Sequence, residues 1–143
     1  MYLLLFSDTQ LQSATDLFAE LFNYYTDQPA ALEDIKSHLE NLTTDVFPMK
    51  IVLAIGDNNH AIGMAAFHHI NSLIEPDNLQ CQMKELFVSK EYRNKGIVRE
   101  LMKWVIDEAK SKGCARIDWN VKAENIEGRR FMNGWAANKS RTA

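Results

Sequence analysis

The sequence predicts an α+β fold in which a mixed, mainly antiparallel sheet carries helices on both faces. Segments rich in β-forming residues alternate with segments of helical periodicity in the order β-α-α-β-β-β-α-β-α. A turn sequence, Gly-Asp-Asn-Asn at residues 56–59, joins two of the strands as a hairpin. The chain has 143 residues, 46% of them hydrophobic, which is enough for one domain, 1–143, with a sizeable core.

The first part of the chain is predicted to form a short strand and two helices. Residues 2–6 are apolar and fit a strand of the core. The first helix spans about residues 11–25, and Pro29 suits the first turn of the second helix, which continues to about residue 42. Both helices carry an apolar stripe at helical spacing, made of Leu11, Ala14, Phe18, Leu21, Phe22 and Tyr25 in the first, and Leu32, Ile35, Leu39 and Leu42 in the second.

The remaining strands follow the second helix. Strands are predicted at residues 49–55, 61–70 and 80–88, and a helix runs from Ile97 to about Lys112, where Gly113 is placed to end it. Residues 116–121 alternate apolar and polar residues, which is typical of a strand with one buried face. Residues 125–132 are helix-like but short, and no clear strand follows, so we expect the C-terminal strands to be truncated or missing.

Composition and charge exclude several classes of protein. The net charge of −3 argues against general nucleic-acid binding, which needs a broad basic surface. No apolar run is long enough to span a bilayer, and the N-terminal run lacks the flanks of a signal peptide. Cys81 and Cys114 form no disulfide framework and no CxxC pair. We therefore expect a cytoplasmic protein that does not bind membranes.

A short basic loop, Arg93-Asn94-Lys95-Gly96, lies between the strand that ends at Val88 and the helix that begins at Ile97. The first amides of a helix have no partner within it and carry the positive end of the helix dipole, so they suit a bound anion. Gly96 allows the backbone to approach the anion closely, and Arg93 and Lys95 add positive charge. The pattern predicts a phosphate-binding site.

The order of the elements, together with this loop, resembles that of the GNAT superfamily, the GCN5-related N-acetyltransferases. The family signature, Arg/Gln-x-x-Gly-x-Gly/Ala, is matched by residues 93–98, Arg-Asn-Lys-Gly-Ile-Val. Residues 125–131, Asn-Ile-Glu-Gly-Arg-Arg-Phe, are similar to the family's Asn-x-x-Ala-x-x-Phe segment, and Ile62-Gly63 matches a small-residue position of its third strand. The resemblance covers most of the chain and is strongest at residues 83–135.

The resemblance implies a cofactor site and a reaction. It implies that acetyl-CoA is the co-substrate, that the loop amides hold its pyrophosphate, and that the backbone of the fourth strand meets its pantetheine arm. A primary amine of a small molecule or peptide attacks directly in a ternary complex, and no metal is needed. Glu85 is the candidate base for that amine. The cofactor-binding residues implied are Leu86, Phe87, Val88, Arg93, Asn94, Lys95, Gly96, Ile97, Val98 and Asn125.

Three departures from the family pattern define the alternatives. Val98 stands where the family favours Gly or Ala, which places a branched side chain near the pyrophosphate. Met132 replaces a Tyr that protonates the leaving sulfur in the family, and Met cannot donate a proton. The expected truncation of the final strands would leave the edge at residues 116–121 uncovered. We therefore expect this edge to be protected by the partner subunit of a homodimer or by the C-terminal tail. The alternatives are a non-catalytic acyl-CoA-binding or interaction module and an inactive truncated product.

For several other chemistry-bearing residues, an ordinary structural role is the alternative to a functional one. Tyr24 and Tyr25 lie in a region that borders the acceptor in the family, and packing is the alternative for both. Adjacent strand residues point to opposite faces, so His68 and His69 are not expected to share a metal ion, although one of them could contact the acceptor. The two cysteines lack a local activating pattern for a nucleophile, and Trp104 and Trp119 are interpreted as core residues.

Overall fold

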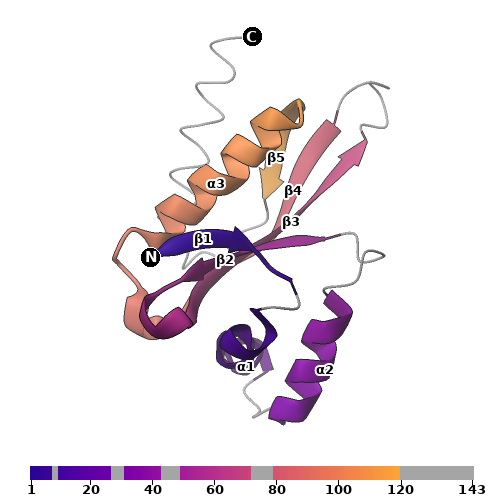
Figure 1. The fold of residues 1–143 in the computed structure, drawn as a ribbon. Helices are drawn as coiled ribbons and strands as arrows, with labels where there is room; N and C mark the ends of the chain where they lie inside the picture. Colours follow the sequence, from indigo (N-terminus) through magenta and orange to yellow (C-terminus); the bar gives the residue numbers. More distant parts are fainter. Residues whose placement is uncertain (8–9, 27–30, 43–48, 72–78, 120–143) are drawn as a thin grey trace.

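A five-stranded sheet in the order β1-β2-β3-β4-β5 forms the centre of the computed structural model (Figure 1). The structure describes residues 1–7, 10–26, 31–42, 49–71 and 79–119. The first three strand pairs are antiparallel and β4 pairs with β5 in parallel, so the predicted mixed, mainly antiparallel sheet is confirmed. The elements are β1 (Tyr2–Leu5), α1 (Leu11–Thr26), α2 (Leu32–Leu42), β2 (Lys50–Ile55), β3 (Ala61–Asn71), β4 (Leu79–Val88), α3 (Ile97–Ser111) and β5 (Cys114–Trp119), with short 3-10 turns η2 (Asp57–Asn59) and η3 (Lys90–Tyr92).

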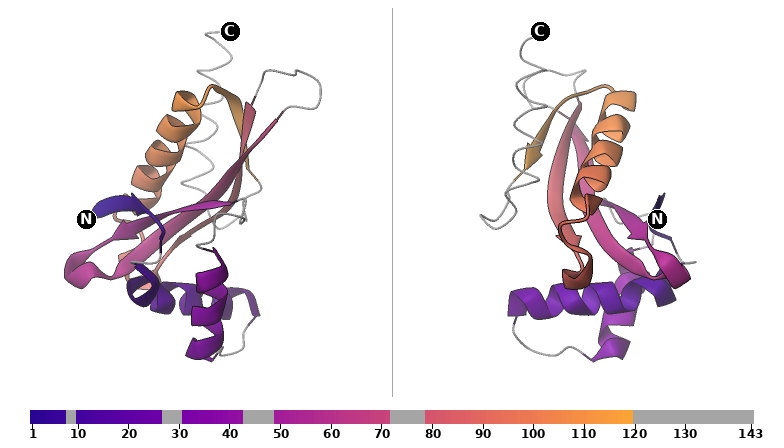
Figure 2. Two further views of the ribbon diagram at one scale, coloured as in Figure 1. Left: turned by 45° about the vertical axis from the view of Figure 1, so that its right-hand side comes forward. Right: turned by 90° about the vertical axis from the view of Figure 1, so that its left-hand side faces the viewer.

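Helices cover both faces of the sheet, as the sequence predicts. Helix α3 lies on one face and α1 and α2 lie on the other (Figure 2). The periodic residues Ile97, Leu101 and Val105 of α3 are buried in one core cluster. A second cluster buries part of the predicted stripes, namely Ala14, Phe18, Ile35 and Leu39, whereas the stripe residues Phe22, Tyr25 and Leu32 are exposed. Trp104 and Trp119 are partly buried against the first cluster, which agrees with their interpretation as core residues.

The ends of the elements differ from the predictions by only a few residues. Gly113 has a φ of 77° directly after α3, which confirms it as the residue that ends this helix. The strand predicted at 116–121 begins earlier, at Cys114, because Cys114 pairs with Leu79 of β4. The helix-like segment 125–132 and the region of the predicted strand truncation lie outside the described residues.

A β-bulge changes which side chains of β4 face each layer. Ala66 of β3 pairs with Glu85, but the next residue, Phe67, pairs with Met83, so Lys84 is the extra residue of β4. Met83 therefore faces the α3 layer, as Leu86 does, although three positions separate them. A regular strand would have placed these two side chains on opposite faces.

Helix α3 sits close to the sheet because β3 contains a glycine. A Cβ on Gly63 would lie 3.3 Å from the side chains of both Ile97 and Leu101 and from the backbone oxygen of Phe87. The absence of a side chain at this position lets the first turn of α3 pack directly against the end of β4. The small residue that the sequence singled out at position 63 thus seats the helix start.

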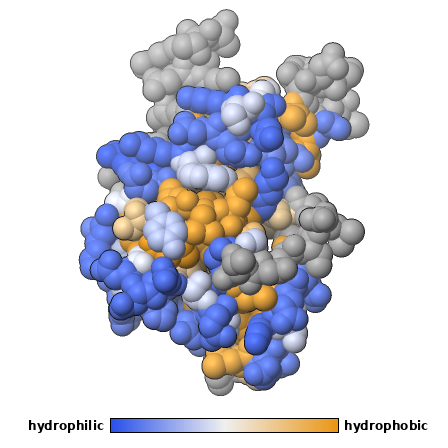
Figure 3. Space-filling model, viewed as in Figure 1, coloured by the Kyte–Doolittle hydropathy of each residue, from blue (hydrophilic) through white to orange (hydrophobic). Residues whose placement is uncertain are grey.

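Strand β1 forms one edge of the described sheet. Tyr2 and Leu5 on this strand are 51% and 45% exposed. Figure 3 shows an apolar area at the centre of this face of the molecule, between α3 and α1. Within the described residues, no helix is long and apolar enough to cross a membrane.

His69 is half-buried on the α3 face of β3, with its Nδ1 3.3 Å from Cys114 Sγ. Its Nε2 has no hydrogen-bond partner within the described part of the chain. Burial lowers the pKa of His69 below its ordinary value of 6.5, Lys50 and Lys112 lower it further, and Glu108 opposes them. The fold therefore accommodates the neutral imidazole.

Because folding lowers the pKa of His69, we expect the free energy of unfolding to fall as the pH drops below 6.5. In that range the imidazole binds a proton in the unfolded state but stays neutral in the folded state, whereas above pH 6.5 it is neutral in both states. Urea unfolding between about pH 8 and pH 5 should show a steeper loss for the wild type than for His69→Gln. The exposed His60→Gln variant should keep the wild-type slope; equal slopes in wild type and His69→Gln would contradict the assignment.

Candidate functional site

The loop between β4 and α3 ends on a helix start that has no side-chain cap. Gly96 is the residue before the first turn of α3 and has a φ of 82°, and the described residues provide no side-chain cap at this position. The first backbone bond of the helix runs from Glu100 N to Gly96 O, at 3.2 Å. The amides of Ile97 and Val98 precede this bond in the chain, and this is the turn where the sequence predicts a bound anion.

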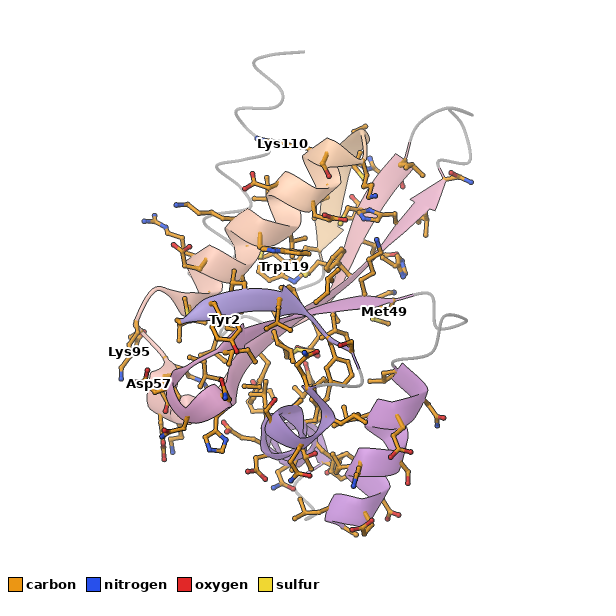
Figure 4. All side chains as sticks on the ribbon, viewed as in Figure 1. Tyr2, Met49, Asp57, Lys95, Lys110 and Trp119 are labelled. Atoms are coloured by element: carbon orange, nitrogen blue, oxygen red, sulfur yellow. The ribbon has the colours of Figure 1, made fainter. Side chains whose placement is uncertain are left out.

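The two basic residues of the loop each contact an aromatic ring. Arg93 Nε donates to Val88 O at 3.0 Å, and its guanidinium carbon lies 5.6 Å from the centre of the Phe87 ring. Lys95 Nζ lies 5.3 Å from the centre of the Tyr92 ring. Figure 4 shows Lys95 at the outer side of the loop, at the same end of the molecule as the turn that holds Asp57. Arg93 is thus held against the end of β4, and Lys95 against the 3-10 turn η3.

Val98 packs inward. Its side chain is partly buried against the core cluster beneath α3. The sequence led us to expect a branched side chain near a bound pyrophosphate, but the structure places much of it against the core. The backbone amide of Val98 is still part of the uncapped first turn.

A carboxylate of α1 ties this loop to the opposite layer. Ser89 Oγ donates to Glu20 Oε1 at 2.7 Å, and the Lys90 amide donates to Glu20 Oε2 at 2.8 Å. Sequence reasoning missed Glu20, because its only local signal is an acidic residue between the apolar Ala19 and Leu21. Its partners lie about seventy positions further along the chain, which no local pattern reveals.

One turn further along α1, two tyrosines contact β4. The Tyr24 ring lies 6.0 Å from the Phe87 ring and 5.3 Å from the Tyr25 ring, edge to face with the latter. The Tyr25 hydroxyl donates to Glu85 Oε2 at 2.7 Å. The sequence singled out Tyr25 and Glu85 separately; the structure brings them together.

Glu85 is held from two sides. It follows the bulge residue Lys84 and turns toward α1, where Tyr25 binds one carboxylate oxygen. The other oxygen, Oε1, lies 3.2 Å from the amide of Leu86. Glu85 is half-buried, so it is fixed in place and still accessible to a solute.

On its β5 side, β4 is paired only along its first half. The last parallel pair is Met83 with Trp119, and within the described residues Glu85 to Val88 pair with β3 alone. The outward-facing amide and carbonyl groups of this segment are next to Glu85 and lead directly into the loop at Arg93. A ligand that follows this edge would reach the start of α3.

The two histidines are separated, as the strand alternation predicts. His68 Nε2 lies 2.9 Å from Gln82 Oε1, whereas His69 contacts Cys114 in the α3 layer. In the described ranges, no group of three His, Cys, Asp or Glu residues could hold a metal ion.

Both cysteines are buried free thiols. Burial raises the pKa of Cys81 to about 12, and burial also raises the pKa of Cys114. The neutral thiol is a poor nucleophile, so these sites suit packing better than covalent catalysis. Asn125 and Met132, which the resemblance singled out, lie outside the described residues.

Comparison with known proteins identifies a family for this arrangement. The model of the acetyltransferase (GNAT) family matches residues 11–134, which is most of the chain. An integron cassette protein from V. cholerae has 25% sequence identity and a TM-score of 0.80, over 93% of this chain and 82% of that one.

Two named acetyltransferases share the fold at lower identity. The ribosomal-protein-alanine N-acetyltransferase from Brucella melitensis has 17% identity and a TM-score of 0.74, over 94% of this chain and 90% of that one. A GNAT family acetyltransferase from Staphylococcus aureus has 19% identity and a TM-score of 0.72, over 87% and 88% of the two chains. At these identities the likeness concerns the fold.

We expect Glu20→Gln to loosen the loop from α1, because it replaces two charge-assisted hydrogen bonds with weaker ones. The free energy of unfolding should fall by about 1–3 kcal/mol, and the Lys90 amide should exchange its hydrogen faster. Asp16→Asn, one turn earlier on α1, is the matched control and should change stability by less than about 0.5 kcal/mol. Unchanged exchange at Lys90 in Glu20→Gln would show that the carboxylate does not hold the loop.

Proposed function

Because the chain belongs to the acetyltransferase (GNAT) family, we propose that it transfers an acetyl group from acetyl-CoA to a primary amine of a small molecule or peptide. The family membership supports acetyl transfer in general. The observation that carries the finer proposal is the continuous path from the edge of β4 beside Glu85, which no described residue of β5 pairs, to the uncapped start of α3. This path offers backbone groups to an extended arm and amides to an anion.

The residues of the path fit acetyl-CoA. A Cβ on Gly96 would have no atom within 4 Å, so the loop backbone is open on that side and a pyrophosphate can approach it. The amides of residues 94–98 would hold the pyrophosphate, with Arg93 and Lys95 adding charge. The backbone of Leu86 to Val88 would accompany the pantetheine arm, and the resemblance assigns Asn125 to the far side of that arm.

Glu85 is the group we assign to the acceptor amine. A protonated amine cannot attack a thioester, so one proton must leave before the new bond forms. The Glu85 carboxylate faces the α1 layer, next to the β4 edge that would hold the thioester. It would take that proton, while donors along the β4 backbone would stabilise the oxyanion that develops on the thioester carbonyl.

Other parts of the proposal concern the whole protein. Strand β5 is the second edge of the described sheet, which supports a homodimer, or the C-terminal tail, as protection for the segment predicted at 116–121. Buried, unpaired Cys81 and Cys114 fit a reducing compartment such as the cytoplasm. Size-exclusion chromatography with light scattering would contradict the dimer if the protein ran as a monomer whose β5 amides exchange fast.

Acetyl-CoA binding is tested with two glycines that share a backbone conformation. Gly96 and Gly113 have φ values of 82° and 77°, and neither would meet an atom within 4 Å on gaining a Cβ. Gly96→Ala and Gly113→Ala should therefore destabilise the protein similarly, by about 1–2 kcal/mol. Acetyl-CoA at about 100 times its Kd should stabilise the wild type and Gly113→Ala by about 2.7 kcal/mol. It should stabilise Gly96→Ala much less in a thermal-shift assay.

If acetyl-CoA does not change the melting temperature of the wild type, the protein has no working site for this molecule. Equal shifts in both glycine variants would place the site elsewhere. Stabilisation without turnover of any amine would favour the alternative of a non-catalytic acyl-CoA-binding module.

Turnover is measured as thiol release from acetyl-CoA with a panel of primary amines. Glu85→Gln keeps an oxygen for the Tyr25 hydroxyl but cannot take a proton at neutral pH. We expect kcat to fall on the order of 100-fold, with the KM for acetyl-CoA nearly unchanged. Glu108→Gln, at the far end of α3, should leave kcat at the wild-type level. Full turnover by Glu85→Gln would disprove the assignment of the base.

A further inference from the structure

We propose that Tyr25 and Glu85 form a proton relay, in which Glu85 takes a proton from the acceptor amine and Tyr25 delivers one to the departing CoA sulfur. The inference rests on the proposed acetyl transfer and adds a catalytic role for a hydroxyl of α1. Its basis is the 2.7 Å hydrogen bond between the two side chains, one from each wall of the site.

The pair is placed and oriented by the structure around it. The bulge at Lys84 turns Glu85 toward α1, and the Leu86 amide lies beside the carboxylate oxygen that Tyr25 does not bind. The Tyr25 ring packs against the Tyr24 ring, which itself packs against Phe87 of β4. With 46% of its surface exposed, Tyr25 can be reached by substrates.

The pair lies where the reaction would take place. Glu85 and its neighbours on β4 are unpaired on the β5 side within the described residues, and this is the edge we assign to the thioester arm. The other carboxylate that α1 brings to β4 and its loop, Glu20, already accepts hydrogen bonds from Ser89 and Lys90. Glu20 therefore holds the loop, whereas the Tyr25–Glu85 pair meets the amine and the sulfur.

The pair accounts for the proton that moves from the amine to the sulfur. Glu85 accepts one proton from the ammonium, and its new O–H donates to the Tyr25 oxygen, which frees the phenolic proton. The amine nitrogen then bonds to the acetyl carbon as the carbon–sulfur bond breaks. Tyr25 protonates the leaving sulfur, and the Glu85 proton moves to the Tyr25 oxygen. The second proton of the nitrogen goes to solvent, so the products are the acetylated amine, CoA thiol and one proton, with both side chains restored.

Tyr25→Phe removes the relay oxygen and little else. With the best acceptor of the panel, we expect kcat to fall on the order of 100-fold while the KM for acetyl-CoA stays within about twofold. Tyr2→Phe is the matched control, because Tyr2 is also about half exposed and donates its hydroxyl to a side-chain oxygen, that of Asn59, at 3.3 Å. It should keep the wild-type kcat, and both variants should melt close to the wild type.

A binding experiment tests the sulfur contact without turnover. CoA and desulfo-CoA differ only at the sulfur, so Tyr25→Phe should weaken CoA binding by about three- to tenfold, the value of one hydrogen bond, and leave desulfo-CoA binding unchanged. Equal effects on both ligands, or none, would overturn the role of Tyr25 as the proton donor.

The outcomes separate the relay from the function on which it rests. Turnover by the wild type with an unchanged kcat in Tyr25→Phe overturns the relay alone. Absence of turnover with every amine overturns the acetyl transfer, and the relay with it. A kcat loss in Tyr25→Phe that is accompanied by equal losses for CoA and desulfo-CoA would leave Tyr25 as a positioning residue for Glu85 and contradict the proton transfer to sulfur.

Discussion

The contact of helix α1 with strand β4 is the constraint on which the rest of the site depends. Glu20 binds the loop after β4, Tyr24 packs on Phe87, and Tyr25 binds Glu85. These contacts occur at successive positions along both elements, so a shift of α1 would disturb all of them together. Helix α1 thereby fixes the loop after β4 and the Glu85 carboxylate relative to one another.

The bulge in β4 allows this strand to direct apolar side chains toward α3 and the Glu85 carboxylate toward α1. Before the bulge Met83 is buried under α3, and after it Leu86 is buried there too. The extra residue, Lys84, allows Glu85 to face α1 without removing an apolar side chain from the core. In a regular strand with the same sequence, either Glu85 would lie beneath α3 together with Met83, or Met83 would face away from α3. Either outcome would cost more than the ladder hydrogen bonds that the bulge disturbs.

The features that depend on local sequence could be predicted correctly. The periodicity of α3, the glycines at its two ends and the opposite directions of His68 and His69 all follow from spacing or backbone conformation, and the structure confirms them. The bulge and the role of Glu20 could not be predicted, because both are set by residues far along the chain. The pairing of Tyr25 with Glu85 required the same long-range register, which no pattern within α1 or β4 encodes.

Val98 departs from the motif, and the packing of its side chain shows how the protein accommodates a branched residue there. A small residue is favoured at this position of the motif, and a branched one suggests a clash with the bound anion. In this protein the Val98 side chain packs partly against the core cluster beneath α3, where Ile97 and Leu101 already lie close to Gly63. What an anion requires from position 98 is the backbone amide, and the amide is set by the conformation of the helix rather than by its side chain. The branched side chain at position 98 therefore affects how α3 packs against the core, and the backbone amide of Val98 keeps its place in the first turn of the helix.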